Sequence, residues 1–439
     1  MVAVCACLFS TAVHGNILSW SGGGGANAYW NNSANWGGAG TPANGDTIIF
    51  QGPQPNLLNT NNIANLVLNQ IRFIGGSGGF DLRGNAFTLT NSIIATNTAG
   101  ANIIENNITL ATATNVQMVV SNGVSLTLDG ALSGSVGVNK AGLGTLTYQG
   151  PGSNPYTGTT LVSGGTLQLN VGGYNAFGGP LIIGDGSGAA ATVRDLQFEE
   201  ISESVPITIN YDGVLDLNNY NETIGPNLTL SGGTIQTSTA TLTLSANSTI
   251  TTTNGYVSNV YGYLNIGSGT LTLQGNGFLF LDASVNGSAN VVQNSANGML
   301  YTYLAGSNSF TGNYTANGGV VVLLNPLALG NTNNAMTLNG QAWLEVAANG
   351  NITNQSLTVN DYGTLDVYGP STNSWHANFT LGSPYTITID VDINCALNLN
   401  GPIGGSGGVT KIGQGRLVYA GTNNNTYAGL TTVTKANWT

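Results

Sequence analysis

Short alternating runs of apolar and polar residues recur from one end of the chain to the other. Each run places Leu, Ile or Val on one face and Thr, Ser, Asn or Gln on the other, which is the period of two of a strand with one buried face. The clearest runs are residues 66–68, 124–128, 145–148, 166–169, 214–217, 228–230, 242–244 and 270–273. Gly/Asn turns separate them, as at Asn122-Gly123 and Asp212-Gly213. No stretch has the 3.6-residue spacing of an amphipathic helix, so the pattern predicts an all-β protein.

A longer repeat predicts how these strands are organised. Residues 138–162 match residues 409–433 without a gap at a constant offset of 271, with 12 of 25 positions identical. A weaker copy lies within residues 300–330, around Gly306-Ser307-Asn308-Ser309-Phe310-Thr311-Gly312. A unit of two or three short strands cannot bury its own apolar face, so we expect the units to stack as a solenoid. Thr and Asn at matching positions would then form hydrogen-bonded ladders between coils.

The repeat resembles a known family. Its pattern K-x-G-x-G-x-L-x-Y-x-G, followed by N-x-Y-x-G-x-T-x-V, is similar to the autotransporter-associated β-strand repeat, also called the passenger-associated-transport repeat. Copies lie near residues 138–170, 300–330 and 409–439. The opening segment, with Trp20, Trp30 and Trp36, resembles the start of mature proteins of this type. The family occurs in large secreted or surface-displayed bacterial proteins.

The resemblance implies a right-handed parallel β-helix. Residues 16–50 would form an aromatic-rich N-terminal cap, and residues 51–439 would form the solenoid. The last copy breaks off at residues 435–439, where the family continues with a further strand, so we expect the gene product to be longer.

Residues 1–15 form an apolar run of signal-peptide length, with small residues Val13 and Gly15 placed to flank a cleavage site. A basic leader region is missing before it, so we expect the true start to lie upstream of Met1. The alternative is a buried N-terminal strand. Removal of this segment leaves Cys395 as the last cysteine, so no disulfide is expected. We predict a secreted protein or one on the bacterial outer surface.

Composition narrows the possible partners. The 439 residues include 65 Gly but only 7 Lys or Arg and 18 Asp or Glu, giving a net charge of -11. So few cations cannot build the basic patch that nucleic acid requires. No further window is apolar enough for a transmembrane helix. Stacked like charges about 4.8 Å apart would repel, which explains a surface rich in Thr and Asn. The remaining partners are an extracellular polysaccharide or the surface of a host or neighbouring cell, and no cofactor is expected.

Carboxylates are the main candidates for catalysis. The two histidines, His14 and His376, cannot supply a catalytic triad or a multi-histidine metal site. Asp390 and Asp392 are two residues apart, so both point to the outward face of a strand. Such a pair is a candidate for general acid–base cleavage of a glycoside or for holding Ca²⁺. The alternative is a pair of solvated carboxylates, which the lack of a cation nearby in sequence favours.

Two further groups are candidate binding sites. Asp195, Glu199, Glu200 and Glu203 could ligate Ca²⁺, but the alternative is a solvated acidic stretch that is the single short non-β segment. Asp366 recurs in a repeat-like context and is interpreted as structural.

The aromatic residues of the opening segment form the second group. Trp20, Tyr29, Trp30 and Trp36 could stack on sugar rings, or they could cover the first apolar layer of the solenoid as a cap.

The leading hypothesis is therefore a non-catalytic exported or surface-displayed β-helical passenger that acts as a stalk, an adhesin or a component of a cell-surface matrix. The first alternative is a carbohydrate-binding module that uses the aromatic residues. The second is a β-helical polysaccharide lyase or hydrolase that uses Asp390 and Asp392.

Overall fold

The computed structural model describes residues 15–98, 100–253, 255–295, 299–352, 355–382 and 384–434. The predicted signal peptide falls outside these residues except for Gly15. Two compact units are present, Met1–Thr160 and Leu161–Thr439. In the described part, one short 3-10 helix, η1 (Ser33–Trp36), interrupts a succession of strands, which confirms the all-β prediction. No helix found there is long and apolar enough to cross a membrane.

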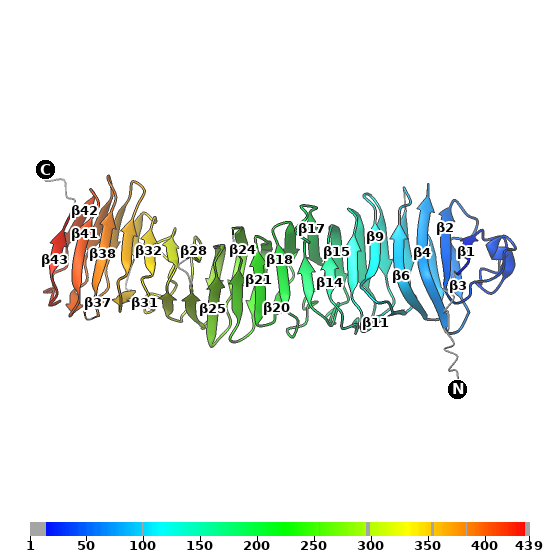
Figure 1. The fold of residues 1–439 in the computed structure, drawn as a ribbon, viewed down its shortest axis with the longest axis horizontal. Coiled ribbons are helices and arrows are strands. Elements are labelled where there is room, and N and C mark those ends of the chain that lie inside the picture. Colours follow the sequence, from blue (N-terminus) through cyan, green and yellow to red (C-terminus); the bar gives the residue numbers. More distant parts are fainter. Residues whose placement is uncertain are drawn as a thin grey trace, which may run out of the picture. The chain divides into compact units, whose positions relative to one another are not determined.

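Unit 1 consists of two parallel sheets, and the chain passes from one to the other repeatedly (Figure 1). The first sheet contains β1 (Ile17–Trp20), β2 (Asp46–Gly52), β4 (Leu66–Gly75), β6 (Phe87–Ala95), β8 (Ile108–Leu110), β9 (Val116–Val120), β11 (Leu132–Gly134) and β12 (Val138–Ala141). The second contains β3 (Leu58–Asn61), β5 (Asp81–Gly84), β7 (Ala101–Ile104), β10 (Ser125–Leu128) and β13 (Thr145–Gln149). The boundary between the units falls in β14 (Thr160–Val162).

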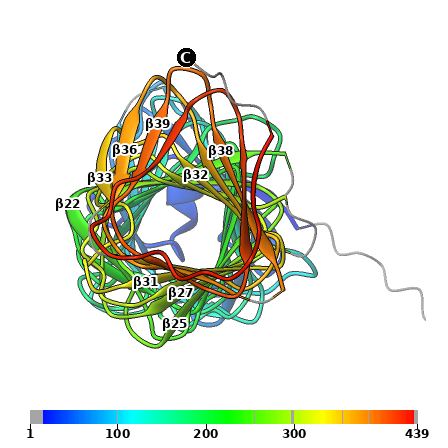
Figure 2. The same cartoon turned by 90° about the vertical axis from the view of Figure 1, so that its left-hand side faces the viewer.

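Unit 2 has three sheets around one interior, seen end-on in Figure 2. Sheet A contains β16 (Leu181–Ile183), β18 (Ile207–Asn210), β21 (Asn227–Ser231), β23 (Thr249–Thr252), β25 (Thr270–Gly275), β27 (Asn290–Asn294), β29 (Tyr314–Asn317), β31 (Ala335–Asn339), β34 (Ser356–Val359), β37 (Phe379–Leu381) and β40 (Ile403–Gly405). Sheet B contains β15 (Gly165–Asn170), β17 (Ala191–Asp195), β19 (Gly213–Asp216), β20 (Glu222–Ile224), β22 (Thr234–Leu244), β24 (Val257–Asn265), β26 (Phe278–Asn286), β28 (Tyr301–Leu304), β30 (Val320–Leu323), β32 (Trp343–Val346), β35 (Thr364–Val367), β38 (Thr386–Val391), β41 (Gly408–Ile412) and β43 (Thr431–Val433). Sheet C contains β33 (Gly350–Ile352), β36 (Thr372–Trp375), β39 (Ala396–Leu399) and β42 (Arg416–Tyr419).

Columns of stacked side chains form the core, because parallel strands in register place like positions directly above one another. One column of sheet A runs through Leu271, Val291, Tyr314, Met336, Leu357, Phe379 and Ile403. All of these side chains are buried. The parallel β-solenoid predicted from the repeat is thus confirmed, while its right-handed sense stays a prediction.

The expected amide ladder is also present in unit 2. Nδ2 of Asn317 donates to Oδ1 of Asn294 at 2.9 Å, and Asn339 donates in the same way to Asn317 at 2.8 Å. Asn360 extends the ladder to Asn339 at 3.2 Å. Each amide lies one coil after the amide to which it donates, so neutral side chains connect four successive coils without stacking charge.

Candidate functional site

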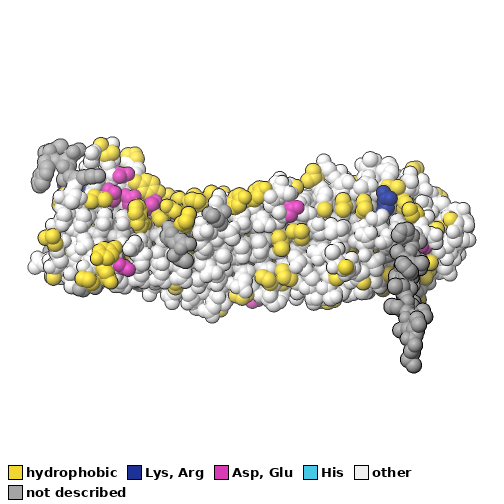
Figure 3. Space-filling model, viewed as in Figure 1, with side chains coloured by type: hydrophobic (Ala, Val, Ile, Leu, Met, Phe, Trp, Pro, Cys, Tyr) yellow, Lys and Arg dark blue, Asp and Glu magenta, His cyan; other side chains and the backbone are white. Residues whose placement is uncertain are grey.

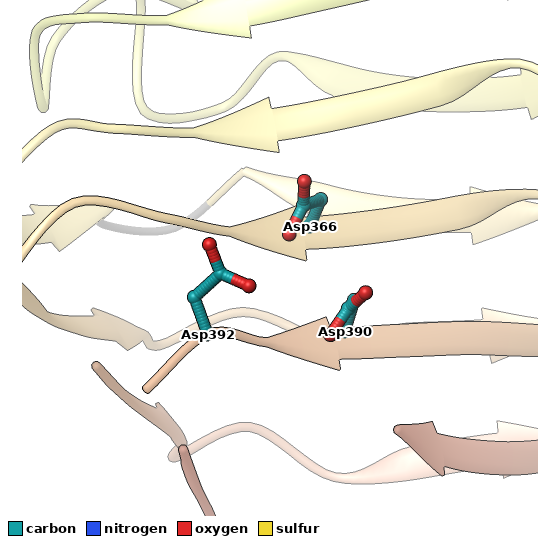
Figure 4. A group of neighbouring side chains, drawn as sticks. All are labelled: Asp366, Asp390 and Asp392. Carbon is teal, nitrogen blue, oxygen red and sulfur yellow. The ribbon is translucent and has the colours of Figure 1, made fainter. Parts of the chain in front are cut away.

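Three carboxylates meet on the outer surface of sheet B (Figure 4). Asp366 on β35 and Asp390 on β38 are direct partners in the parallel register, and Asp392 follows β38. One carboxylate oxygen from each residue lies within 4.8 Å of the other two. Asp366 and Asp390 are half-buried, whereas Asp392 is exposed. The sequence predicted the pair Asp390 and Asp392, but it assigned Asp366 a structural role and did not place it beside them.

Burial and mutual repulsion shape the electrostatics of this group. Burial raises the pKa of the Asp366 carboxyl to about 6, and the carboxylates of Asp390, Asp392 and Glu345 add to the rise. Lys411, on the next strand β41, is the cation that local sequence did not reveal. Burial lowers the pKa of its ammonium group, and Asp390 partly opposes this effect. No ion pair between Lys411 and these carboxylates is formed in the described residues, because the lysine Nζ donates to the carbonyls of Ile412 and Gly413.

This arrangement has a limited chemical repertoire. Three carboxylate oxygens at this separation could share a proton, hold a hard divalent cation or receive a cationic side chain. Oδ1 of Asp366 and Oδ1 of Asp390 are both buried without a hydrogen-bond partner, so each has unused acceptor capacity.

The acidic run 195–203 is not the solvated stretch that the sequence suggested. Asp195 and Glu200 are completely buried, and Asp195 lies in strand β17. The Glu200 carboxylate accepts the backbone N–H groups of Val171 and Gly172, each at 3.0 Å. Glu199 and Glu203 are exposed, and Glu199 bonds the next coil through Thr223. The structure therefore corrects the solvated interpretation for Asp195 and Glu200, while Ca²⁺ binding by this run stays a prediction.

Glu222 is a residue that the sequence analysis missed. It is completely buried, and its carboxylate accepts the N–H groups of Glu200 and Ile201 at 2.9 and 3.0 Å. Burial raises its pKa to about 8. Asp195 lies in the core beside Leu169 of the preceding strand, and neither of its carboxylate oxygens has a hydrogen-bond partner. Burial, followed by repulsion from Glu222 and Glu200, raises the pKa of the Asp195 carboxyl well above its usual value.

Two surface hollows have different linings. The larger, in unit 2, has a volume of about 580 Å³ and is lined by Thr251, Gln274, Gly275, Asn276, Asn294, Ser295 and Asn317. None of these side chains can act as a general acid or base at neutral pH. The smaller, in unit 1, has a volume of about 280 Å³ and includes Glu105 and Asp129 in its lining. Arg83 pairs with Glu105 at 3.1 Å, so one of these two carboxylates already has a cationic partner.

The opening tryptophans form a buried cluster. Trp36 packs edge-on against Trp20 and Trp30, with ring centroids 5.2 and 6.0 Å apart. Each indole N–H has a partner within the chain: Trp20 donates to Asn56 O, Trp30 to Asn59 Oδ1, and Trp36 to Trp30 O.

The sequence proposed these rings and Tyr29 as ligand contacts. The three tryptophans are at most 2% exposed, whereas Tyr29 is 49% exposed. Sugar binding by the cluster stays a prediction, and Tyr29 is the ring that an incoming ligand would meet.

The repeat residues make contacts within a coil and to the coil before it. In the first copy, Oδ1 of Asn154 accepts the N–H of Leu132 at 2.8 Å. The Lys140 Nζ donates to the carbonyls of Ala141 and Gly142 at 3.3 and 2.8 Å. At the motif glycine Gly158, a Cβ atom would collide with the backbone of the preceding coil. The motif therefore specifies how one coil docks on the previous one.

Comparison with known proteins gives one similarity and two negative results. The chain is 33% identical over 132 residues, 30% of its length, to the adhesin BmaC autotransporter of Brucella suis biovar 1 (strain 1330). The matched part amounts to 3% of that much longer protein. No family model matches the chain, so its membership of the repeat family stays a prediction. No solved structure matches it either.

Proposed function

We propose that this chain is a non-catalytic passenger displayed on the bacterial surface or secreted from the cell, where it serves as a stalk, an adhesin or a component of a surface matrix. The similarity to an autotransporter adhesin carries the proposal. The parallel β-solenoid supports it, because stacked coils present many similar neutral polar side chains and weak contacts made in parallel add up.

Adhesion of coated beads tests this function directly. Latex beads carrying the purified full chain should attach to cultured cells or to abiotic surfaces more strongly than beads carrying albumin. Beads coated with heat-unfolded chain are the matched control, because composition is unchanged while the fold is lost. Attachment no stronger than that of albumin-coated beads would contradict the proposal.

The polysaccharide-cleaving alternative has the proximity of Asp366, Asp390 and Asp392 in its favour. Incubation with acidic and neutral polysaccharides, with and without Ca²⁺, should release no reducing sugar if the passenger function is right. Release that is abolished in Asp390→Asn but retained in Glu203→Gln, a change at an exposed carboxylate elsewhere in unit 2, would establish catalysis instead.

A further inference from the structure

Unit 2 carries an apolar strip on the outward face of sheet B, which we call the aromatic face. It is formed by Val257, Phe278, Phe280, Tyr301, Tyr303 and Trp343. These residues occupy outward positions, since the residues that alternate with them, such as Leu279, Thr302 and Leu344, are completely buried. Figure 3 shows hydrophobic side chains in a row along a hollowed stretch of the upper edge, over β24 to β32.

The rings of this face are arranged by the strand register. Phe280 and Tyr303 are direct partners and stack with centroids 3.9 Å apart and planes 6° apart. Phe278 and Tyr301 stack in the same way at 5.2 Å. Trp343 extends the same row of outward positions two strands further and is 46% exposed. Aromatic pairs of this kind stabilise a sheet, but an exposed indole at the end of the row gains nothing from remaining in water.

The aromatic face continues directly into carboxylates. The row that contains Phe280 and Tyr303 passes through Val322, whose own side chain is buried, to Glu345, and then to Asp366 and Asp390. Each step is one strand of the parallel sheet. The apolar row and the acidic row therefore form a single strip across the seven strands β24 to β38, about 29 Å long at the usual strand spacing.

The acidic end lacks cationic partners from its own coils. The sequence contains no Lys or Arg between Arg194 and Lys411. Lys411 is occupied with backbone carbonyls. Oδ1 of Asp366 and Oδ1 of Asp390 are both buried without a hydrogen-bond partner. A cation supplied from outside would meet the solvent-accessible side of these half-buried carboxylates. It would relieve the repulsion that adds to the effect of burial on the pKa of Asp366.

We propose that the strip binds a polypeptide segment of a partner protein that carries apolar side chains followed by Lys or Arg side chains. The apolar side chains would cover the rings between Val257 and Trp343. The cationic side chains would pair with Glu345, Asp366 and Asp390. This inference deepens the proposed adhesive function, on which it rests, by naming the class of partner.

Charge complementarity favours this partner over two others. A neutral glycan could stack on rings but would leave the three carboxylates without a counter-charge. A second copy of the chain would bring its own carboxylates to the same place, and its net charge of -11 opposes close approach. An extended segment of about nine residues spans the strip, so the contact is short enough for one exposed segment of a partner.

Binding of synthetic peptides to the full chain tests the proposal. The first fluorescein-labelled peptide of about nine residues would have a Trp-containing half followed by an Arg-containing half. In the second peptide Gln replaces Arg (Trp/Gln), in the third Gly replaces Trp (Gly/Arg), and the affinities would be compared by fluorescence anisotropy. The Trp/Arg peptide should bind at least tenfold more tightly than either of the others. Its affinity should fall when salt is raised from 0.05 to 0.5 M, because the acidic end is accessible to ions.

Variants place the binding on the strip. Trp343→Thr should lower the affinity for the Trp/Arg peptide about tenfold. The double variant Glu345→Gln/Asp366→Asn should weaken it by a similar factor and reduce its salt dependence. The matched controls Phe198→Thr and Glu203→Gln, which change an exposed ring and an exposed carboxylate elsewhere in unit 2, should bind as the wild type does. Thermal unfolding followed by circular dichroism identifies any variant that fails to fold, and Asp366→Asn alone then replaces the double variant.

Four results would overturn the inference. The first is equal affinity for the Trp/Arg and Trp/Gln peptides, and the second is an equal loss of affinity in the control variants. The third is binding of a neutral oligosaccharide that Trp343→Thr abolishes, while no peptide binds. The fourth is a dimer of the chain that Trp343→Thr dissociates. Bead adhesion separates this proposal from the adhesive function. Adhesion without peptide binding would refute only the proposal that the strip binds a polypeptide. Peptide binding without adhesion would refute only the adhesive function.

Discussion

In the first copy of the repeat, Tyr148 is completely buried, whereas its counterpart Tyr419 in the second copy is 39% exposed. The hydrogen bonds of the two copies nevertheless correspond. Asn154 accepts the N–H of Leu132 at 2.8 Å, and Asn425 accepts the N–H of Ile403 at 2.9 Å. The same sequence pattern thus forms the same local polar contacts in two very different environments.

The reason is the direction in which each contact runs. The motif asparagine bonds the coil before its own, 22 residues earlier in both copies. The motif tyrosine bonds the threonine four residues later, Tyr156 to Thr160 and Tyr427 to Thr431, at 2.6 Å each. Burial of the motif instead depends on a coil stacked on its other side, and the second copy contains the last described strand, β43. These polar contacts therefore do not depend on a coil stacked on the other side of the motif.

The largest difference in stability loss between the two copies is expected when Tyr148→Ala is compared with Tyr419→Ala. Removing the buried ring of Tyr148 leaves a cavity and should lower the free energy of unfolding by about 3 to 5 kcal/mol. Removing the partly exposed ring of Tyr419 should cost less than about 1 kcal/mol. Urea unfolding followed by circular dichroism measures both. Equal losses would mean that the second copy is as well covered in solution as the first.

Replacing the motif asparagine should give the next largest difference in stability loss between the copies. Asn154→Ala leaves the buried N–H of Leu132 without an acceptor and should cost about 2 kcal/mol. Asn425 is exposed, so water can replace its amide in Asn425→Ala, and the loss should stay below about 1 kcal/mol. The buried Asn308 of the third copy accepts the N–H of Val285 at 2.9 Å, so Asn308→Ala should behave like Asn154→Ala. A cost at Asn308 as small as that at Asn425 would break this link between burial and cost.

The motif lysines should differ in how stability depends on pH. Burial lowers the pKa of Lys140 to about 8, while an unfolded lysine keeps its proton to about 10.4. The unfolded chain therefore binds more protons between these values, so this residue makes stability rise with pH, by about 1 to 2 kcal/mol from pH 7.5 to 9.5. Lys140→Met should remove that rise. Lys411→Met should remove a smaller one, because Asp390 opposes the lowering of the Lys411 pKa. Urea midpoints measured across this pH range test the prediction, and an unchanged slope in Lys140→Met would contradict it.

The smallest effect is expected for the tyrosine–threonine hydrogen bond. Thr160→Val removes a buried partner of the Tyr156 hydroxyl, which keeps a longer contact to the Tyr148 hydroxyl at 3.4 Å. We expect a loss of about 1 kcal/mol. Thr431→Val lies at an exposed site and should be neutral within error. The thermal unfolding midpoints of the two variants measure this difference. A larger loss of stability in Thr431→Val than in Thr160→Val would contradict the prediction.

The fold could be predicted because alternation and repeat are both local properties of a solenoid. All eight apolar runs singled out in the sequence contribute to strands, and the matching asparagines form the expected ladder. The approach of Lys411 to Asp390 could not be predicted, because the register places Lys411 opposite Ile389, next to Asp390, and sequence spacing alone does not specify that register. The burial of Asp195 did leave a signal. Asp195 continues the alternation that points Ala191 and Val193 inward, but a charged residue is not expected at an inward position, so the pattern was overlooked.

The amide ladder of unit 2 has a mechanical consequence. A force pulling along the direction in which coils stack loads the hydrogen bonds between coils along their own length, so they open one coil at a time. The ladder from Asn294 to Asn360 adds a bond at every such step over four coils, at separations of 23, 22 and 21 residues. Each coil released would lengthen the chain by about 75 Å, the extended length of some 22 residues. Such a series of small, repeated extensions would spread the work of stretching the chain over many separate steps.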